Sequence, residues 1–201
     1  MKTISRITLT LGLIFTFGSL SAQDFKFGIQ AGTNLAVQSP IGDYYNNEDI
    51  RAGLHAGVFG NYSFNESIYL QAELNYDQKG SQTKDATNKY DYISVPVLFN
   101  YSLGKSWKTP LRFNIYAGPY AAFLVNSETD FDTDEFNGTV DMKDNTENTE
   151  FGLITGFGLR YPIKESSLMF NIRLGLGLTS VDKMDADPKN KYIGLSLGYE
   201  F

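Results

Sequence analysis

The chain offers few side chains for catalysis, and His55 is its only histidine. A metal site built on several imidazoles is therefore excluded, and a Ser–His–acid hydrolase would depend on this one residue. His55 stands mid-way along an alternating segment, on its polar side, where a buried hydrogen-bonding role competes with catalysis. Because a catalytic site must be open to substrate, we favour the hydrogen-bonding role and predict that the protein is not an enzyme.

Three carboxylates at alternate positions, Asp130, Asp132 and Asp134, have the one–three–five spacing of a calcium-binding loop. The EF-hand pattern needs glycine at its sixth position, where this chain has Glu135, and a bidentate glutamate at its twelfth, where it has Asp141. A solvated acidic loop is therefore the favoured interpretation, and weak calcium binding is the alternative. We expect no resident metal and no cofactor.

The amino terminus has the pattern of a secretory signal peptide. Lys2 and Arg6 precede an apolar run over residues 7–17, and mostly small residues follow the run as far as Ala22. The run is shorter than the roughly 20 residues that a membrane-spanning helix needs. We therefore predict a cleaved signal peptide at residues 1–22 and a single domain at residues 23–201.

Composition and charge narrow the class of protein. Loss of Lys2 and Arg6 with the signal peptide leaves 15 of the 17 basic residues against 23 acidic ones, a net charge near −8. This balance argues against nucleic acid as a partner. The chain has no cysteine, so its stability must come from strand pairing and packing. Its 13 Tyr, 15 Phe and 19 Gly are typical of strands and turns.

Apolar and polar residues alternate with period two in eight segments, as in strands that have one polar and one apolar face. The predicted strands cover residues 24–31, 53–64, 68–77, 91–101, 111–123, 150–161, 168–179 and 191–201. Phe59 breaks the pattern, because it is apolar in a polar position. Pro96 removes a backbone donor and predicts a bulge or a locally broken ladder.

The connections alternate between long and short. Polar stretches at 37–49, 79–89, 126–148 and 181–190 read as long loops, and short turns separate the other strands. Outer-membrane barrels have long extracellular loops, tight periplasmic turns and an even number of antiparallel strands. We therefore predict an all-β fold, an eight-stranded antiparallel up-and-down transmembrane β-barrel that is closed by its first and last strands.

The alternation also assigns the polar face to the inside of the barrel. A soluble barrel such as a lipocalin would have apolar residues inside, around a ligand. Five charges of each sign in a narrow tube predict a mutually paired lumenal network. Its predicted members are Lys26, Arg51, Arg112, Arg160 and Arg173 with Glu73, Asp77, Asp91, Glu150 and Glu200.

The last strand ends in Tyr199 and Phe201, with an aromatic residue at the final position. We expect this end to act as the signal by which the barrel assembly machinery recognises its substrate. The alternative is an ordinary hydrophobic role for Phe201 in the strand.

Several segments carry a resemblance that spans most of the chain. They are GIQAGTN at 28–34, residues 69–76 followed by Lys79-Gly80, YISVPVL at 92–98, YAGPY at 116–120, and residues 151–160. In this order they resemble the outer-membrane β-barrel proteins of Bacteroidetes, which include PorT-like proteins, and other OmpA-like eight-stranded barrels. The resemblance implies a location in the outer membrane of a Gram-negative bacterium, and it does not assign an activity.

The expected function is a structural or interaction role through long extracellular loops, without catalysis. The alternatives are a component of a secretion or transport system, as the resemblance to PorT suggests, and a narrow pore. Side chains fill the interior of an eight-stranded barrel, which argues against a wide channel. The expected partners are outer-membrane lipid, the barrel assembly machinery and, for the PorT-like alternative, secretion-system proteins.

Overall fold

The computed structural model describes residues 25–39, 49–103, 110–133, 137–183 and 188–201, and most of these residues belong to strands. The predicted signal peptide lies outside the described residues. A short 3₁₀ turn, η2, occupies Lys143–Asn145. No helix in the described ranges is long and apolar enough to cross a membrane. The strands are β1 (Phe25–Ser39), β2 (Arg51–Ser63), β3 (Ile68–Gln82), β4 (Ala86–Leu103), β5 (Arg112–Asp132), β6 (Asn137–Asp141), β7 (Thr149–Ile163), β8 (Ser166–Gly177) and β9 (Lys189–Glu200).

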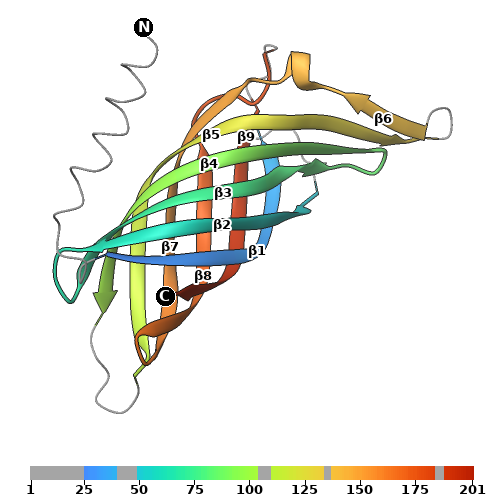
Figure 1. Cartoon of the computed structure of the whole chain (residues 1–201). Coiled ribbons are helices and arrows are strands. Elements are labelled where there is room, and N and C mark those ends of the chain that lie inside the picture. Colours follow the sequence, from blue (N-terminus) through green and yellow to red (C-terminus); the bar gives the residue numbers. More distant parts are fainter. Residues whose placement is uncertain (1–24, 40–48, 104–109, 134–136, 184–187) are drawn as a thin grey trace, which may run out of the picture.

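Eight of these strands form a closed antiparallel barrel, as predicted (Figure 1). The sheet order is β4-β3-β2-β1-β9-β8-β7-β5, and pairing of β4 with β5 completes the ring. The first and last strands pair from Gly28 opposite Glu200 to Ser39 opposite Lys189. We call the end of the barrel that carries the start of β1 and the end of β9 the terminal rim, and the opposite end the loop rim.

Two predicted loops are largely strand, which corrects the sequence-based interpretation. β3 and β4 stay paired as far as Gln82 opposite Thr87, so only residues 83–85 form the turn that was expected to span 79–89. Within 126–148, β5 continues to Asp132 and β6 returns along it. Beyond the bilayer a strand needs no apolar face, so its ladder continues without the periodicity that marks it in sequence. Residues 80–91, 125–132 and 137–141 form this sheet extension, which projects past the ring in Figure 1.

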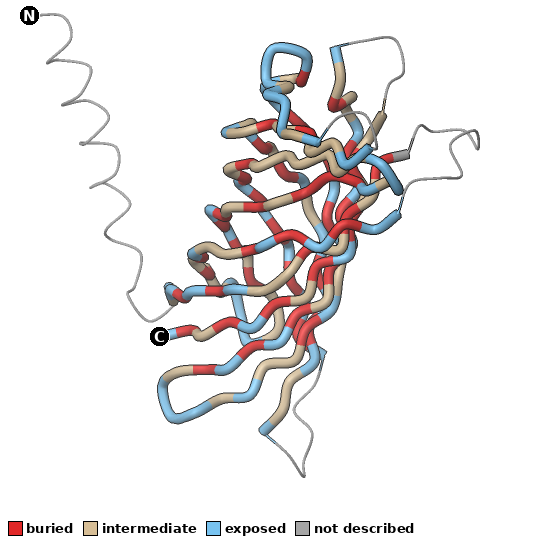
Figure 2. Tube along the Cα trace, turned by 90° about the vertical axis from the view of Figure 1, so that its right-hand side faces the viewer, coloured by how far each residue is buried: buried red, intermediate tan, exposed pale blue. Residues whose placement is uncertain are grey.

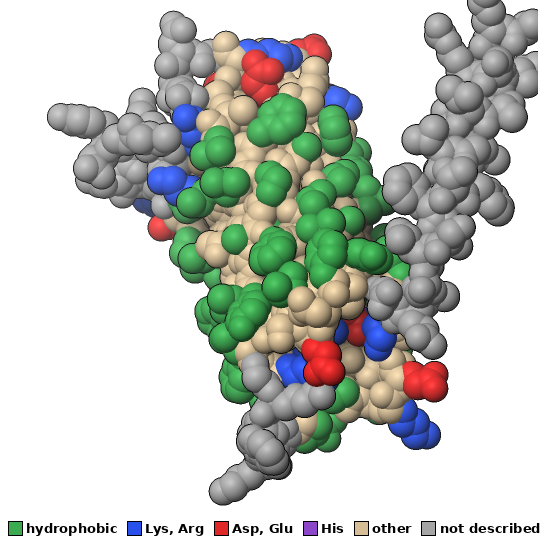
Figure 3. Space-filling model, turned by 90° about the vertical axis from the view of Figure 1, so that its left-hand side faces the viewer, with side chains coloured by type: hydrophobic (Ala, Val, Ile, Leu, Met, Phe, Trp, Pro, Cys, Tyr) green, Lys and Arg blue, Asp and Glu red, His purple; other side chains and the backbone are tan. Residues whose placement is uncertain are grey.

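The outer face of the barrel is an apolar belt. Buried and exposed residues alternate along the strands (Figure 2). Phe27, Leu174 and Leu197 expose 62%, 49% and 69% of their surface, which would be unfavourable over so many strands in water but suits contact with lipid. Figure 3 shows apolar side chains across the middle of one face and charged side chains toward both ends. The belt therefore marks the part of the barrel that crosses the membrane.

The two residues that interrupt the sequence pattern have structural explanations. Phe59 points into the barrel, only 3% exposed, and its ring fills the space beside Gly28, where a Cβ would lie 2.1 Å from the ring. The β3–β4 ladder passes over Pro96 with a gap and resumes in the same register. The ladder is therefore locally broken at Pro96, one of the two predicted outcomes, and contains no extra residue there.

We predict that Leu174→Arg lowers the free energy of unfolding from lipid vesicles by about 2–4 kcal/mol, because an arginine near the bilayer centre must be moved out of water. Leu178→Arg, beyond the end of β8 at the loop rim, is the matched control and should cost only about 0–1 kcal/mol. Urea unfolding from vesicles measures both. Equal effects of the two substitutions would contradict the assigned depth of the belt.

Candidate functional site

Among the described residues, four buried carboxylates follow one another along the interior of the barrel from the terminal rim to the loop rim. In this order they are Glu200, Glu73, Asp77 and Glu150, and each is at most 3% exposed. A carboxylate removed from water needs a cation or several hydrogen-bond donors. Each of the four has such a set, and the sets join strands on opposite sides of the lumen.

Glu200 lies nearest the terminal rim. Its Oε2 accepts hydrogen bonds from Arg160 Nη2 at 2.9 Å and Asn61 Nδ2 at 2.6 Å, and its Oε1 lies 3.5 Å from Lys26 Nζ. The guanidinium of Arg160 also lies over the ring of Tyr69, 4.9 Å from its centroid. This cluster joins β1, β2, β3, β7 and β9.

Glu73 forms the next layer with Arg173. The Arg173 Nη1 and Nη2 atoms lie 2.9 and 3.3 Å from the two carboxylate oxygens, a bidentate pair between β3 and β8. Three amides complete the shell, with donors 2.6–2.9 Å from the carboxylate: Gln30, Gln71 and Asn75. Glu73 therefore has both a cation and a full set of N–H donors.

Asp77 lies one layer closer to the loop rim than Glu73 and contacts His55, the only histidine of the sequence. The Nδ1 atom of His55 lies 2.6 Å from Asp77 Oδ1, Asn34 Nδ2 donates to the same oxygen at 2.9 Å, and the Ser94 hydroxyl donates to the other. His55 is only 1% exposed. The imidazole is therefore a member of the lumenal network. Its burial beside Asp77 agrees with the hydrogen-bonding role that the sequence analysis favoured over catalysis.

Glu150 and Lys79 form the layer toward the loop rim, with their charged atoms 2.7 Å apart and both side chains almost fully buried. Tyr120 and Asn190 donate to the same carboxylate. The Lys79 Nζ atom lies 4.6, 5.0 and 5.1 Å from the ring centroids of Tyr120, Tyr192 and Tyr92. An ammonium group among aromatic faces is stabilised by their quadrupoles. This aromatic cage therefore compensates part of the loss of water around Lys79.

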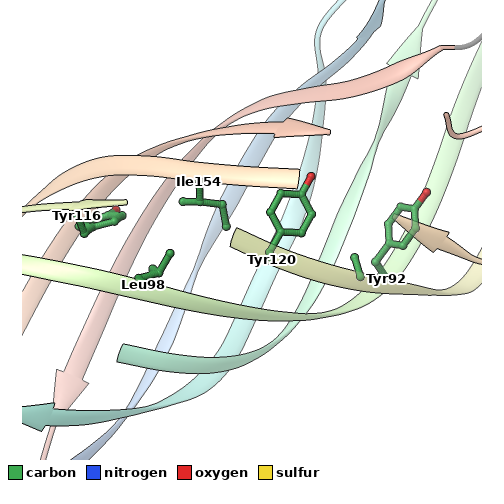
Figure 4. Close-up of a cluster of buried hydrophobic side chains, with 6 residues drawn as sticks. Tyr92, Leu98, Tyr116, Tyr120 and Ile154 are labelled. Carbon is green, nitrogen blue, oxygen red and sulfur yellow. The ribbon is translucent and has the colours of Figure 1, made fainter. Parts of the chain in front are cut away.

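Sequence reasoning missed Lys79, because it fell in the stretch assigned to a loop. The sequence could have indicated it, because Lys79 is an even number of positions from Glu73 and Asp77, and such residues share one face of a strand. The aromatic content of the lumen was also missed. Buried apolar and tyrosine side chains form a cluster inside the barrel, and Figure 4 shows five of them: Tyr92, Leu98, Tyr116, Tyr120 and Ile154.

Glycines on neighbouring strands make room for the lumenal tyrosines. A Cβ on Gly175 would lie 2.0 Å from the ring of Tyr192, and one on Gly152 would lie 2.5 Å from the ring of Tyr120. Such contacts are far below van der Waals distance, so these rings require the absence of a side chain opposite them. The paired glycines and tyrosines fill the interior with side chains.

Three predicted members of the network lie outside these ion pairs. Asp91 accepts a hydrogen bond from Gln78 at 3.1 Å on the outer face, because it alternates along β4 with Tyr92, whose side chain points inward. This corrects the lumenal assignment of Asp91. Arg51 donates to the backbone carbonyl of Lys79 instead of a carboxylate. Arg112 is half-buried beside Arg160, and the described residues include no carboxylate in contact with it.

The acidic residues with calcium-loop spacing lie mostly on paired strands. Asp130 forms an ion pair with Lys89 and accepts from Thr139 Oγ1 at 2.8 Å, and Asp132 accepts from Asn137 Nδ2 at 3.1 Å. The hydrogen bond from Lys89 holds the pKa of Asp130 below its ordinary value. Asp134 lies outside the described residues. The described part of the chain contains no cluster of three or more His, Cys, Asp or Glu side chains arranged to hold a metal ion.

Tyr199 and Phe201 stand together at the terminal rim. Their ring centroids are 5.1 Å apart, and Phe201 N donates to the carbonyl of Phe27 at 2.8 Å. Phe201 exposes 60% of its surface on the outer face. Its position suits contact with lipid, and recognition by the assembly machinery stays a prediction.

A closed barrel with an apolar outer belt and a polar, packed interior defines an integral outer-membrane barrel protein. In agreement, residues 19–183 match the family described as the outer membrane protein beta-barrel domain, and the chain belongs to this family. The outer membrane of a Gram-negative bacterium is therefore its location. Among curated proteins, no sequence matches the chain.

Solved structures of outer-membrane proteins are similar to this chain at low identity. Ail, the attachment invasion locus protein of Yersinia pestis, is 14% identical, with a TM-score of 0.46 over 89% of this chain and 99% of that one. Neisserial surface protein A is 12% identical, with a TM-score of 0.48 over 86% and 95%. OprG of Pseudomonas aeruginosa is 12% identical, with a TM-score of 0.46 over 88% and 95%. Similarity at this level assigns no function.

We predict that Lys79→Met lowers the free energy of unfolding by about 3–5 kcal/mol, because it leaves the Glu150 carboxylate buried without its cation. Lys79→Met combined with Glu150→Gln should recover part of this loss, since the remaining amide is uncharged. Lys89→Met removes a half-exposed ion pair in the sheet extension and should cost about 0–1 kcal/mol. Equal costs for Lys79→Met and Lys89→Met in urea unfolding would show that the buried pair has no special weight.

Proposed function

We propose that the protein is a non-catalytic outer-membrane barrel that anchors the sheet extension in the membrane and presents it to a protein partner at the loop rim. The observation that carries this proposal is the contrast between the two parts of β5. From Arg112 to Phe123 this strand forms barrel wall with β7, and from Glu128 to Asp132 it pairs with β6 outside the ring. A strand needs only about 9–11 residues to cross a membrane, so this extra length serves a purpose beyond crossing it.

The sheet extension has a defined shape before any partner binds. Asn88 and Thr129 are hydrogen bonded at 2.9 Å across β4 and β5, and Asp130 is held by both Lys89 and Thr139. Preformed surfaces lose less entropy on binding than flexible loops do. The outer strand β6 has mostly exposed residues, and a short edge strand of this kind is a surface on which a partner can pair or pack.

The segments around the extension also hold together. Thr146 and Asp182 form an isolated bridge, and Glu147 N donates to the carbonyl of Val181 at 2.8 Å. Val181 is only 2% exposed. The segment between β6 and β7 and the segment after β8 are therefore packed against each other at the loop rim, and support a rigid interaction surface.

A narrow pore and a component of a secretion or transport system are the alternative functions. The filled lumen argues against a pore, because four charged layers and the tyrosine rings occupy its length. A PorT-like role in secretion would also use a surface at the loop rim. It would differ from the role of a free-standing barrel in that the partner would be a secretion-system protein. His55 has no part in catalysis in this proposal, since it is enclosed with Asp77.

We predict that the purified protein gives no stable conductance of the size of a diffusion pore in planar lipid bilayers. Side chains fill the interior of an eight-stranded barrel, so only brief, small events are expected. Lys79→Ala combined with Glu150→Ala, which empties the layer near the loop rim, is the comparison in which conductance should increase. Stable large openings of the unaltered protein would contradict the proposal and favour the pore.

We also predict that affinity capture from outer membranes recovers a specific partner that depends on the sheet extension. Replacing residues 126–148 with a four-residue Gly-Ser turn should abolish capture, while the shortened protein still shows the migration difference between unboiled and boiled samples that marks a folded barrel. Substituting Glu165→Gln in an exposed turn at the other rim is the control and should leave capture unchanged. Equal recovery by the shortened protein would refute the role of the extension.

A further inference from the structure

Basic side chains outnumber acidic ones inside the terminal rim. Lys26, Arg112 and Arg160 lie on inward-facing positions there, and Glu200 is the one carboxylate in contact with any of them among the described residues. Three cations and one carboxylate leave two positive charges. The other two carboxylates described near this rim, Glu66 and Glu165, are on exposed turns.

Arg112 and Arg160 stand directly opposite each other in the β5–β7 ladder. Opposite residues of an antiparallel pair have Cβ atoms about 4.5–5.5 Å apart, and like charges in such positions repel each other. Glu200 and the ring of Tyr69 fix the guanidinium of Arg160. Arg112 has no such partner among the described residues. The pair therefore favours a bound negative charge.

Two enclosed N–H groups at this rim also have no acceptor among the residues that the structure describes. Asn114, which follows Arg112 on the same face, is 2% exposed; its Oδ1 accepts from the Ser102 hydroxyl at 2.6 Å, and its Nδ2 has no hydrogen-bond partner. The Nε of Arg160 is likewise buried without a partner. Buried donors are nearly always paired in proteins, so unpaired donors beside two guanidinium groups point to an acceptor with several oxygens.

We propose that Arg112, Arg160 and Asn114 form a binding site for a phosphate group inside the terminal rim. The planar guanidinium fork matches a phosphate in geometry, and the surplus of two positive charges at this rim, one of them from Lys26, matches a phosphate dianion in charge. Lys26, whose side chain is 42% exposed, stands at the entrance and attracts anions from solution. Free inorganic phosphate and the headgroup of a lipid in the adjacent leaflet share this chemistry.

The test is calorimetric titration of the protein in an uncharged maltoside detergent, with inorganic phosphate and with a short-chain phosphatidic acid as separate probes. We expect saturable binding of at least one probe. Arg112→Gln should weaken it at least about tenfold, because one charge-assisted contact is lost. Asn114→Asp should abolish binding without unfolding the barrel, because it supplies a carboxylate where the phosphate would lie and keeps the acceptor for Ser102.

Lys164→Gln removes a positive charge from the exposed turn at the same rim and is the matched control. It should change the affinity by less than about twofold, since screened surface charges act weakly. Binding of phosphate alone identifies the free anion as the ligand, and binding of the lipid probe alone identifies the headgroup. The proposal is overturned if neither probe binds, or if Arg112→Gln and Lys164→Gln have equal effects in variants that retain the folded migration on gels.

Discussion

The pairing of β1 with β9 is the constraint on which the rest of the structure depends. A backbone N–H or C=O group without a partner costs several kcal/mol in lipid, so a sheet can cross a membrane only when it has no free edge. The ladder between Gly28 and Ser39 removes that edge. Once the sheet is closed, each strand has one face toward lipid and one toward the lumen, and the opposite chemistry of the two faces follows.

Closure also makes the lumen narrow, and this governs how charge can be placed inside it. Every enclosed carboxylate must find its partners across a space that side chains fill. Glu73 takes its cation from β8, and Glu150 takes its cation from β3. Glycines opposite Tyr120 and Tyr192 let aromatic rings enter between these layers. The network thus joins strands that share no backbone ladder, and the same packing fills the lumen with side chains.

The membrane limits only part of the chain. Beyond the belt β3, β4 and β5 continue as a sheet with polar faces, and β6 adds a strand that the closed ring does not need. The barrel and the extension share continuous strands, so the orientation of the extension is fixed by the barrel. At the terminal rim the opposite situation holds, because the turns are short and the excess of basic side chains lies within the mouth itself.

The sequence by itself determined the eight barrel strands, their closure and the apolar belt, because period-two alternation is local and a bilayer demands it of every strand. It also placed Glu73, Asp77, Glu150 and Glu200 on the inner face. Only the tertiary structure decided which cation meets which carboxylate, since Lys79 reaches Glu150 across 71 positions of sequence. Contacts across a lumen depend on the stagger of all the strands, and this stagger leaves no periodic signal in the sequence. The length of a strand beyond the lipid leaves no such signal either.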